Sequence, residues 1–187
     1  MKALAKLLPF LFLSACSTST QNLPPLEVVA KVDLQRYLGK WYEVARIEHW
    51  FQKGCVNSEA NYSLRDDGDI KVVNRCIKKG STNKEDKPKE ATARAWVVDE
   101  TTNAKLKVQF PLREIKLGFL SGNYWIIDLD ENYQYVMVGD PTRDYLWILS
   151  RSKIMAPETL SALITKAKNV GYDIDRIIYE EGNTPPF

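Results

Sequence analysis

The chain has 187 residues, of which 44% are hydrophobic and 27% are charged. This composition is ordinary for a globular protein, and the length is sufficient for one hydrophobic core, so we expect a single folded domain. Lysine and arginine number 26 against 24 aspartates and glutamates, which gives a formal net charge of +2. So small an excess gives no electrostatic reason to expect a nucleic-acid partner, and we expect none.

The first residues have the three parts of an export signal. Lys2 and Lys6 supply positive charge, an apolar run follows from Leu7 to Leu13, and small residues lead up to Cys16. The apolar run is shorter than the about 20 residues that a membrane-spanning helix requires. We therefore expect residues 1–15 to be a signal peptide that is removed on export.

The end of this segment, Leu13-Ser14-Ala15-Cys16, resembles the lipobox of bacterial lipoproteins, in which cleavage precedes a cysteine that receives lipid. The alternative is an ordinary signal with a chance cysteine at its end. The resemblance makes Cys16 the lipidation site and residues 16–32 a flexible tether, with serine and threonine directly after Cys16. In such lipoproteins a serine after the cysteine implies the outer membrane, so we expect a lipid-anchored protein facing the periplasm.

Two cysteines remain beyond Cys16. Export places Cys55 and Cys76 in an oxidising compartment, where a disulfide persists. Neither has another cysteine or a histidine at metal-ligand spacing, so we expect no metal. A turn at residues 66–69 would place Cys76 opposite Ser58 or Glu59, so the bond requires a bulge or a folded-back loop before it can close.

Residues 33–187 contain short runs rich in valine, isoleucine, tyrosine and tryptophan, separated by polar turns, a pattern typical of all-β proteins. The predicted strands cover residues 40–47, 57–64, 69–77, 91–98, 104–110, 123–128, 133–139 and 145–151. We interpret the charged segment 78–90 as a solvated loop. Eight strands in meander order predict one closed, antiparallel, up-and-down barrel.

One helix and one further strand are expected after the barrel. Residues 157–170 begin with a proline and place Leu160, Leu163, Ile164 and Ala167 on one face, with Gly171 directly after them. This pattern predicts a helix packed on the outside of the barrel. Residues 174–179 predict a short final strand beside the first.

Alternation along the strands identifies the side chains that point inward. Lysines alternate with Leu106 and Val108, and the same face includes Phe110. The parity argument extends to three more strands and assigns to the interior Ala60, Tyr62, Leu64, Ile70, Val72, Asn74, Ala93 and Ala95. The small alanines leave room for a ligand, while Asn74 is either a polar group of the cavity or a structural asparagine.

Three motifs, in order along the chain, resemble the signatures of the lipocalin family. Gly39-Lys40-Trp41 resembles Gly-x-Trp, the segment 139–145 resembles the second signature with Arg143 in place of the usual threonine, and Arg151 resembles the third. The resemblance implies that Trp41 plugs one end of the barrel under the guanidinium of Arg151, a contact worth roughly 0.5–2 kcal/mol. The alternative is an ordinary core tryptophan and a surface cation.

Within the family, segments 62–68 and 144–151 resemble the subgroup of bacterial outer-membrane lipocalins, apolipoprotein D and plant relatives. This resemblance implies a fatty acid or lysophospholipid ligand, a role in membrane maintenance under stress, and in some members a homodimer. An acyl chain would gain about 0.8 kcal/mol per buried methylene. We expect the ligand-binding residues to be Ala45, Ala60, Tyr62, Val72, Asn74, Ala93, Leu106, Val108, Phe110, Tyr124, Ile126, Tyr145 and Trp147.

Two other classes of function are alternatives to ligand binding. The chain has one histidine and lacks a nucleophile elbow, a metal-spaced cluster and a phosphate loop, so we expect no enzyme, no catalytic residue and no cofactor. An anchored structural protein with a filled barrel and a partner-binding surface is the second alternative. The segment His49-Trp50-Phe51, after the first strand, is either a lid or membrane contact, or a small satellite core.

Overall fold

The computed structural model describes residues 23–80, 85–110 and 121–185. The expected signal peptide, the lipidation site Cys16 and the first part of the tether lie outside the described residues. No helix among the described residues is both long and apolar enough to span a membrane.

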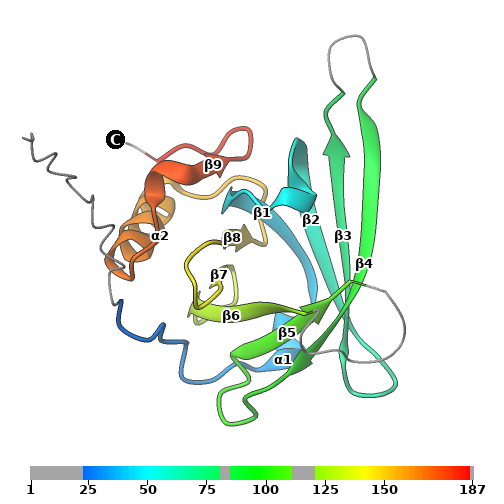
Figure 1. Ribbon diagram of the computed structural model, residues 1–187, viewed down its shortest axis with the longest axis vertical. Helices are drawn as coiled ribbons and strands as arrows, with labels where there is room; N and C mark the ends of the chain where they lie inside the picture. Colours follow the sequence, from blue (N-terminus) through cyan, green and yellow to red (C-terminus); the bar gives the residue numbers. More distant parts are fainter. Residues whose placement is uncertain (1–22, 81–84, 111–120, 186–187) are drawn as a thin grey trace, which may run out of the picture.

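The strands form one antiparallel sheet that closes on itself (Figure 1). Its order is β2-β3-β4-β5-β6-β7-β8-β1-β9, and a further pairing of β1 with β2 completes the ring. The predicted eight-stranded antiparallel barrel, with one additional strand, is therefore confirmed. The strands are β1 (Gly39–Ile47), β2 (Cys55–Leu64), β3 (Ile70–Lys78), β4 (Lys87–Val97), β5 (Lys105–Gln109), β6 (Gly122–Leu129), β7 (Tyr135–Gly139), β8 (Leu146–Ser150) and β9 (Ile177–Tyr179).

The hairpin of β3 and β4 is longer than predicted and projects beyond the rest of the barrel (Figure 1). β3 continues to Lys78, which pairs with Lys87 at the start of β4. The segment 78–90 is thus only partly a loop. Every residue from 85 to 90 is exposed, so no alternation of apolar and polar side chains marked this part of the strand.

The core has two layers, one inside the barrel and one outside it. The helix α2 (Pro157–Asn169) covers the outer face, and its residues Leu160, Leu163, Ile164 and Ala167 are buried as predicted. Shorter helical segments are α1 (Leu34–Tyr37), η1 (Trp50–Gln52) and η3 (Ile174–Arg176). Strands between the two layers therefore have both faces buried, as Ile148 on β8 illustrates at 0% exposure.

The second half of the expected tether is part of the fold. Leu26 is buried in the outer core and Val32 in the inner core, and the Val32 amide donates to the carbonyl of Thr102 at 2.7 Å. Arg143 Nη2 donates to the carbonyl of Pro24 at 2.6 Å. Apolar side chains in this segment thus favour packing on the barrel over a flexible tether, which corrects the expectation for residues 26–32.

A bulge in β1 reverses the expected alternation. The register with β8 shifts between Glu43 and Ala45, so Glu43 lines the barrel interior whereas Ala45 packs in the outer core with α2. The prediction that Ala45 contacts a ligand was wrong, because one extra residue in a strand moves the following side chains to the opposite face. Leu64 was also misassigned: at the end of β2 it is 52% exposed.

Side chains replace backbone pairing where β1 diverges from β2. β1 pairs with β2 only over Gly39–Tyr42 and continues against β8 and β9. Arg46 Nη1 lies 3.3 Å from Glu180 Oε1, and the Glu180 carboxylate accepts the amides of Asn57 at 2.7 Å and Ser58 at 3.3 Å. We call this bridge of Arg46 and Glu180 the seam, since it joins β1, β2 and the residue after β9.

Candidate binding cavity

One end of the barrel is plugged. Trp41 is fully buried, and its indole donates to the carbonyl of Tyr37 at 2.8 Å. The Arg151 guanidinium lies 3.8 Å from the ring centroid and donates to the carbonyls of Lys40, Arg36 and Leu38. Gly39 has φ of +92°, a left-handed conformation that favours glycine, and a Cβ there would lie 3.5 Å from Arg151 Nη1.

Between this plug and the other end lies a cavity of about 660 Å³. That volume is within the range of pockets that hold a small organic ligand. Apolar and aromatic side chains make up much of its wall: Ala60, Tyr62, Val72, Ala91, Val108, Phe110, Tyr124, Trp147 and Leu149. The barrel is therefore not filled by its own side chains.

The structure brings most of the predicted ligand-binding residues to this cavity. Its wall includes Ala60, Tyr62, Val72, Asn74, Val108, Phe110, Tyr124, Tyr145 and Trp147. Leu106 and Ile126 lie around a small void nearer the plug, and Ala93 is buried in the inner core without lining the cavity. Only Ala45 faces out of the barrel.

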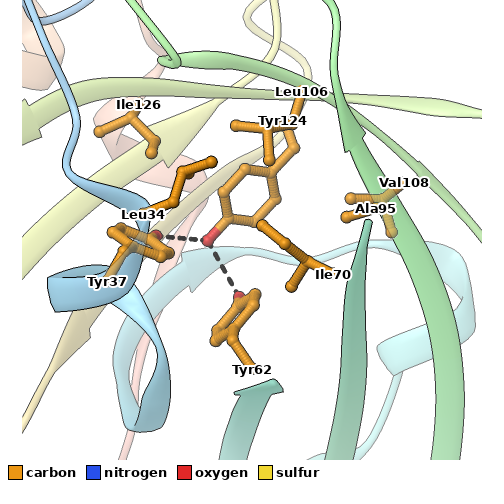
Figure 2. A pocket seen from close by; sticks show the side chains of 9 residues that line it. All are labelled: Leu34, Tyr37, Tyr62, Ile70, Ala95, Leu106, Val108, Tyr124 and Ile126. Carbon is orange, nitrogen blue, oxygen red and sulfur yellow. Dashed lines mark hydrogen bonds between the residues drawn. The ribbon is translucent and has the colours of Figure 1, made fainter. Parts of the chain in front are cut away.

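Three tyrosine hydroxyls meet at this end of the cavity (Figure 2), where the ring of Tyr37 lies 5.2 Å from the ring of Trp41 in the plug. Tyr124 Oη is 2.6 Å from Tyr37 Oη and 2.9 Å from Tyr62 Oη, so the three form a hydrogen-bonded chain. Burial raises the pKa of Tyr62 to about 12 and the pKa of both other tyrosines well above the usual value. We call these residues the tyrosine triad; they give the cavity a neutral floor.

The opposite end of the cavity, which we call the mouth, is bordered by η1 and residues 140–145. His49 packs against Phe51 and Tyr145 in tilted arrangements, with ring centroids 3.9 and 4.1 Å apart, and partial burial lowers the pKa of His49. Phe51 in turn packs against Phe110, and their ring centroids are 5.3 Å apart. Trp50, by contrast, is 79% exposed, so one residue of the segment projects into solvent while its neighbours pack over the cavity.

Sequence reasoning missed a polar group on the cavity wall. Gln52 Nε2 donates to Glu43 Oε2 at 2.6 Å, and Gln52 Oε1 accepts from the Trp147 indole at 3.0 Å. Glu43 also pairs with Arg46 behind the wall, while burial raises the pKa of Glu43 against the opposing effect of that guanidinium. We call Glu43, Gln52 and Ser58, which all line the cavity, the polar wall group. An acidic residue two positions after an inward tryptophan was the signal available in the sequence.

The predicted disulfide joins Cys55 and Cys76, whose Cα atoms are 5.5 Å apart. The register between β2 and β3 shifts between Val56 and Glu59, and Asn57 within that shift has φ of +51°. The expectation that a bulge brings the two cysteines together is confirmed. The described residues contain no group of three or more histidines, cysteines, aspartates or glutamates that could hold a metal ion.

A closed barrel with one plugged end, one open mouth and an apolar cavity between them defines a protein that carries a small ligand inside the barrel. The chain belongs to the lipocalin family: the family model described as a lipocalin-like domain matches residues 32–182.

Comparison with known proteins supports this assignment. The outer membrane lipoprotein Blc of Vibrio cholerae is 37% identical over 180 residues, covering 96% of this chain and 98% of the relative. Blc of Escherichia coli K12 is 38% identical over 167 residues, covering 88% and 87% respectively. Insecticyanin of the tobacco hornworm Manduca sexta has the same fold at 16% identity, with a TM-score of 0.65 over 87% of this chain and 89% of that structure.

Proposed function

We propose that this lipocalin is anchored to the outer membrane through Cys16, faces the periplasm, and binds the acyl chain of one fatty acid or lysophospholipid. The single observation that carries the proposal is the cavity of about 660 Å³ with an apolar wall. Each methylene buried there contributes about 0.8 kcal/mol, so a long chain supplies enough free energy for stable binding. The names of the bacterial relatives, outer membrane lipoproteins, support the location.

The orientation of the ligand follows from the two ends of the cavity. The tyrosine triad is neutral and its hydroxyls bond to one another, which suits the end of an acyl chain more than a charged head. Two exposed cations line the cavity: Lys89, which donates to the carbonyl of Phe51 at 2.7 Å near the mouth, and Arg75, which pairs with Glu90 at 2.7 Å. A negatively charged head therefore remains near these cations while the chain extends towards Tyr124.

Native mass spectrometry with lipid extraction tests the proposal. The chain carrying Cys16→Ser is purified from a bacterial host, so that no anchor lipid is counted as ligand. We expect one fatty acid or lysophospholipid for each barrel, and its loss when Ala60→Trp fills the cavity. Ala162→Trp, an exposed position on α2, is the matched control. The mass of the intact complex also reports whether the protein forms the homodimer that the resemblance implies.

An empty protein that takes up no added lipid would overturn the proposal. The filled-barrel alternative would then also need to explain the volume left between Val72, Val108 and Trp147. Turnover of lipid by purified protein would instead favour an enzyme.

A further inference from the structure

One polar atom on the cavity wall has no hydrogen-bond partner among the described residues. Ser58 is 5% exposed, and its buried Oγ makes no hydrogen bond to any described residue. A buried hydroxyl left in this state costs roughly 1–3 kcal/mol of desolvation free energy. Because Ser58 lines the cavity, a ligand can supply the missing partner.

The acidic member of the polar wall group lies on the neighbouring strand. The pairing of β1 with β2 ends at Tyr42 and Glu59, and Glu43 and Ser58 are the residues that follow this last pair on the two strands. Both residues line the cavity. The Glu43 carboxylate accepts from Arg46 and from Gln52, one bond on each oxygen. A carboxylate has about four acceptor positions, so Glu43 retains acceptor capacity on the same cavity wall as the Ser58 hydroxyl.

The charges on the wall restrict what binds there. The buried charged residues that line the cavity, Glu43 and Asp140, are both acidic, whereas the lining cations Arg75 and Lys89 are exposed. Asp140 already accepts from Thr142 and from the amide of Tyr145. The Arg46 guanidinium behind the wall already pairs with the carboxylates of Glu43 and Glu180. A further anionic group near Glu43 would therefore be repelled, which disfavours a ligand carboxylate at this depth.

We propose that Glu43 and Ser58 form a subsite for a neutral hydroxyl of the ligand, which donates to Glu43 and accepts from Ser58. This inference rests on the proposed function, since it concerns the same cavity. It names the ligand class more closely: a single-chain amphiphile that carries a free alcohol next to its acyl chain. Gln52 positions the Glu43 carboxylate for this contact and links it to Trp147.

Two ligands with the same acyl chain test the subsite. 1-Monooleoylglycerol has free hydroxyls and methyl oleate has none, and both are neutral esters. Their affinities for the Cys16→Ser chain are measured by titration calorimetry, with each ligand delivered from cyclodextrin. The variant Ser58→Ala removes only an unpaired hydroxyl, so we expect it to fold with undiminished stability. Ser63→Ala, on the exposed face of the same strand, is the control.

We expect Ser58→Ala to weaken 1-monooleoylglycerol binding about three- to tenfold and to leave methyl oleate binding within twofold, whereas Ser63→Ala changes neither. An unchanged ratio of the two affinities in Ser58→Ala would overturn the subsite and leave the proposed function intact. A large loss of stability in Ser58→Ala would also overturn it, because the hydroxyl would then have a structural partner. If neither ligand binds the Cys16→Ser chain with its native cavity residues, the proposed function and the subsite are overturned together.

Discussion

At the scale of single residues, the tyrosine triad determines the polarity of the cavity floor. Each tyrosine places a phenol ring against apolar neighbours, and the three hydroxyls satisfy one another. Tyr124 is the central member because it bonds to both Tyr37 and Tyr62. A hydrogen-bonded chain of neutral groups avoids the cost of unpaired polar atoms in the core. It also keeps all three hydroxyls neutral over the physiological range, because burial opposes ionisation.

The raised pKa of Tyr62 predicts a loss of stability at alkaline pH. Tyr62 stays neutral in the folded protein up to about pH 12, whereas in the unfolded chain it ionises near 10. Its contribution is therefore fully present below about pH 10 and is lost as pH rises to about 12. We expect Tyr62→Phe to remove about 2 kcal/mol of the alkaline decline in the free energy of unfolding. Urea unfolding between pH 9 and about 12 measures this, and parallel curves for the two proteins would contradict it.

At the scale of elements, the seam explains how β1 serves three neighbours. Its first half pairs with β2 and its second half with β8 and β9. The divergence leaves backbone amides of β2 without strand partners, and the Glu180 carboxylate accepts two of them. Arg46, 3% exposed, neutralises Glu180 and also donates to the carbonyl of Cys55 at 3.0 Å. Charged side chains thus join strands where backbone pairing ends.

Removing the seam carboxylate tests this account. Glu180→Ala leaves the amides of Asn57 and Ser58 without their acceptor and removes one partner from a buried guanidinium. We expect a loss of about 3 kcal/mol in the free energy of unfolding, with faster hydrogen exchange at these two amides. Glu181→Ala, at the adjacent exposed position, is the control and should change neither. Equal behaviour of the two variants would show that the seam contributes no net stability.

At the scale of the whole molecule, the barrel has two different ends and two faces. The plug of Trp41 and Arg151 closes one end, while η1 covers the other without filling the cavity. α2 protects the outer face of the strands opposite the exposed β3–β4 hairpin (Figure 1). We therefore expect the ligand to enter and leave through the mouth. Trp147 lines the cavity near this end, with its ring 6.5 Å from that of His49.

Tryptophan fluorescence tests the route and the site at this scale. A fatty acid with bromines along its chain quenches nearby indoles, and Trp147 lines the cavity whereas Trp125 packs on the outer core. We expect Trp147→Phe to remove a large part of the quenching and Trp125→Phe to leave it nearly unchanged. A larger effect of Trp125→Phe would place the ligand on the outside of the barrel.

The inward face of β2 to β5 was predictable because polar and apolar residues alternate there. Lysines and arginines on one side left Val72, Leu106 and Val108 on the other, and the structure places all three inside. The face of α2 was predictable for the same reason, through the helical period. Each of these patterns is local, so a few consecutive residues are sufficient to fix it.

The polar wall group and the seam depend on information that is not local. The bulge after Glu43 has no glycine or proline to mark it, and it alone moved Ala45 out of the barrel. Gln52 reaches the wall from a short helical segment whose position is set by its packing against Tyr145 and Phe110. Glu180 is 134 positions from Arg46, so no spacing rule connects them.

That separation also orders events during synthesis. The ribosome synthesises β1 early, but Glu180, whose carboxylate bridges β1 and β2, is synthesised only after all eight strands of the barrel. Until then the second half of β1 has an open edge, and open strand edges pair readily with other chains. We therefore expect a chain that ends before Glu180 to aggregate more readily than the full chain.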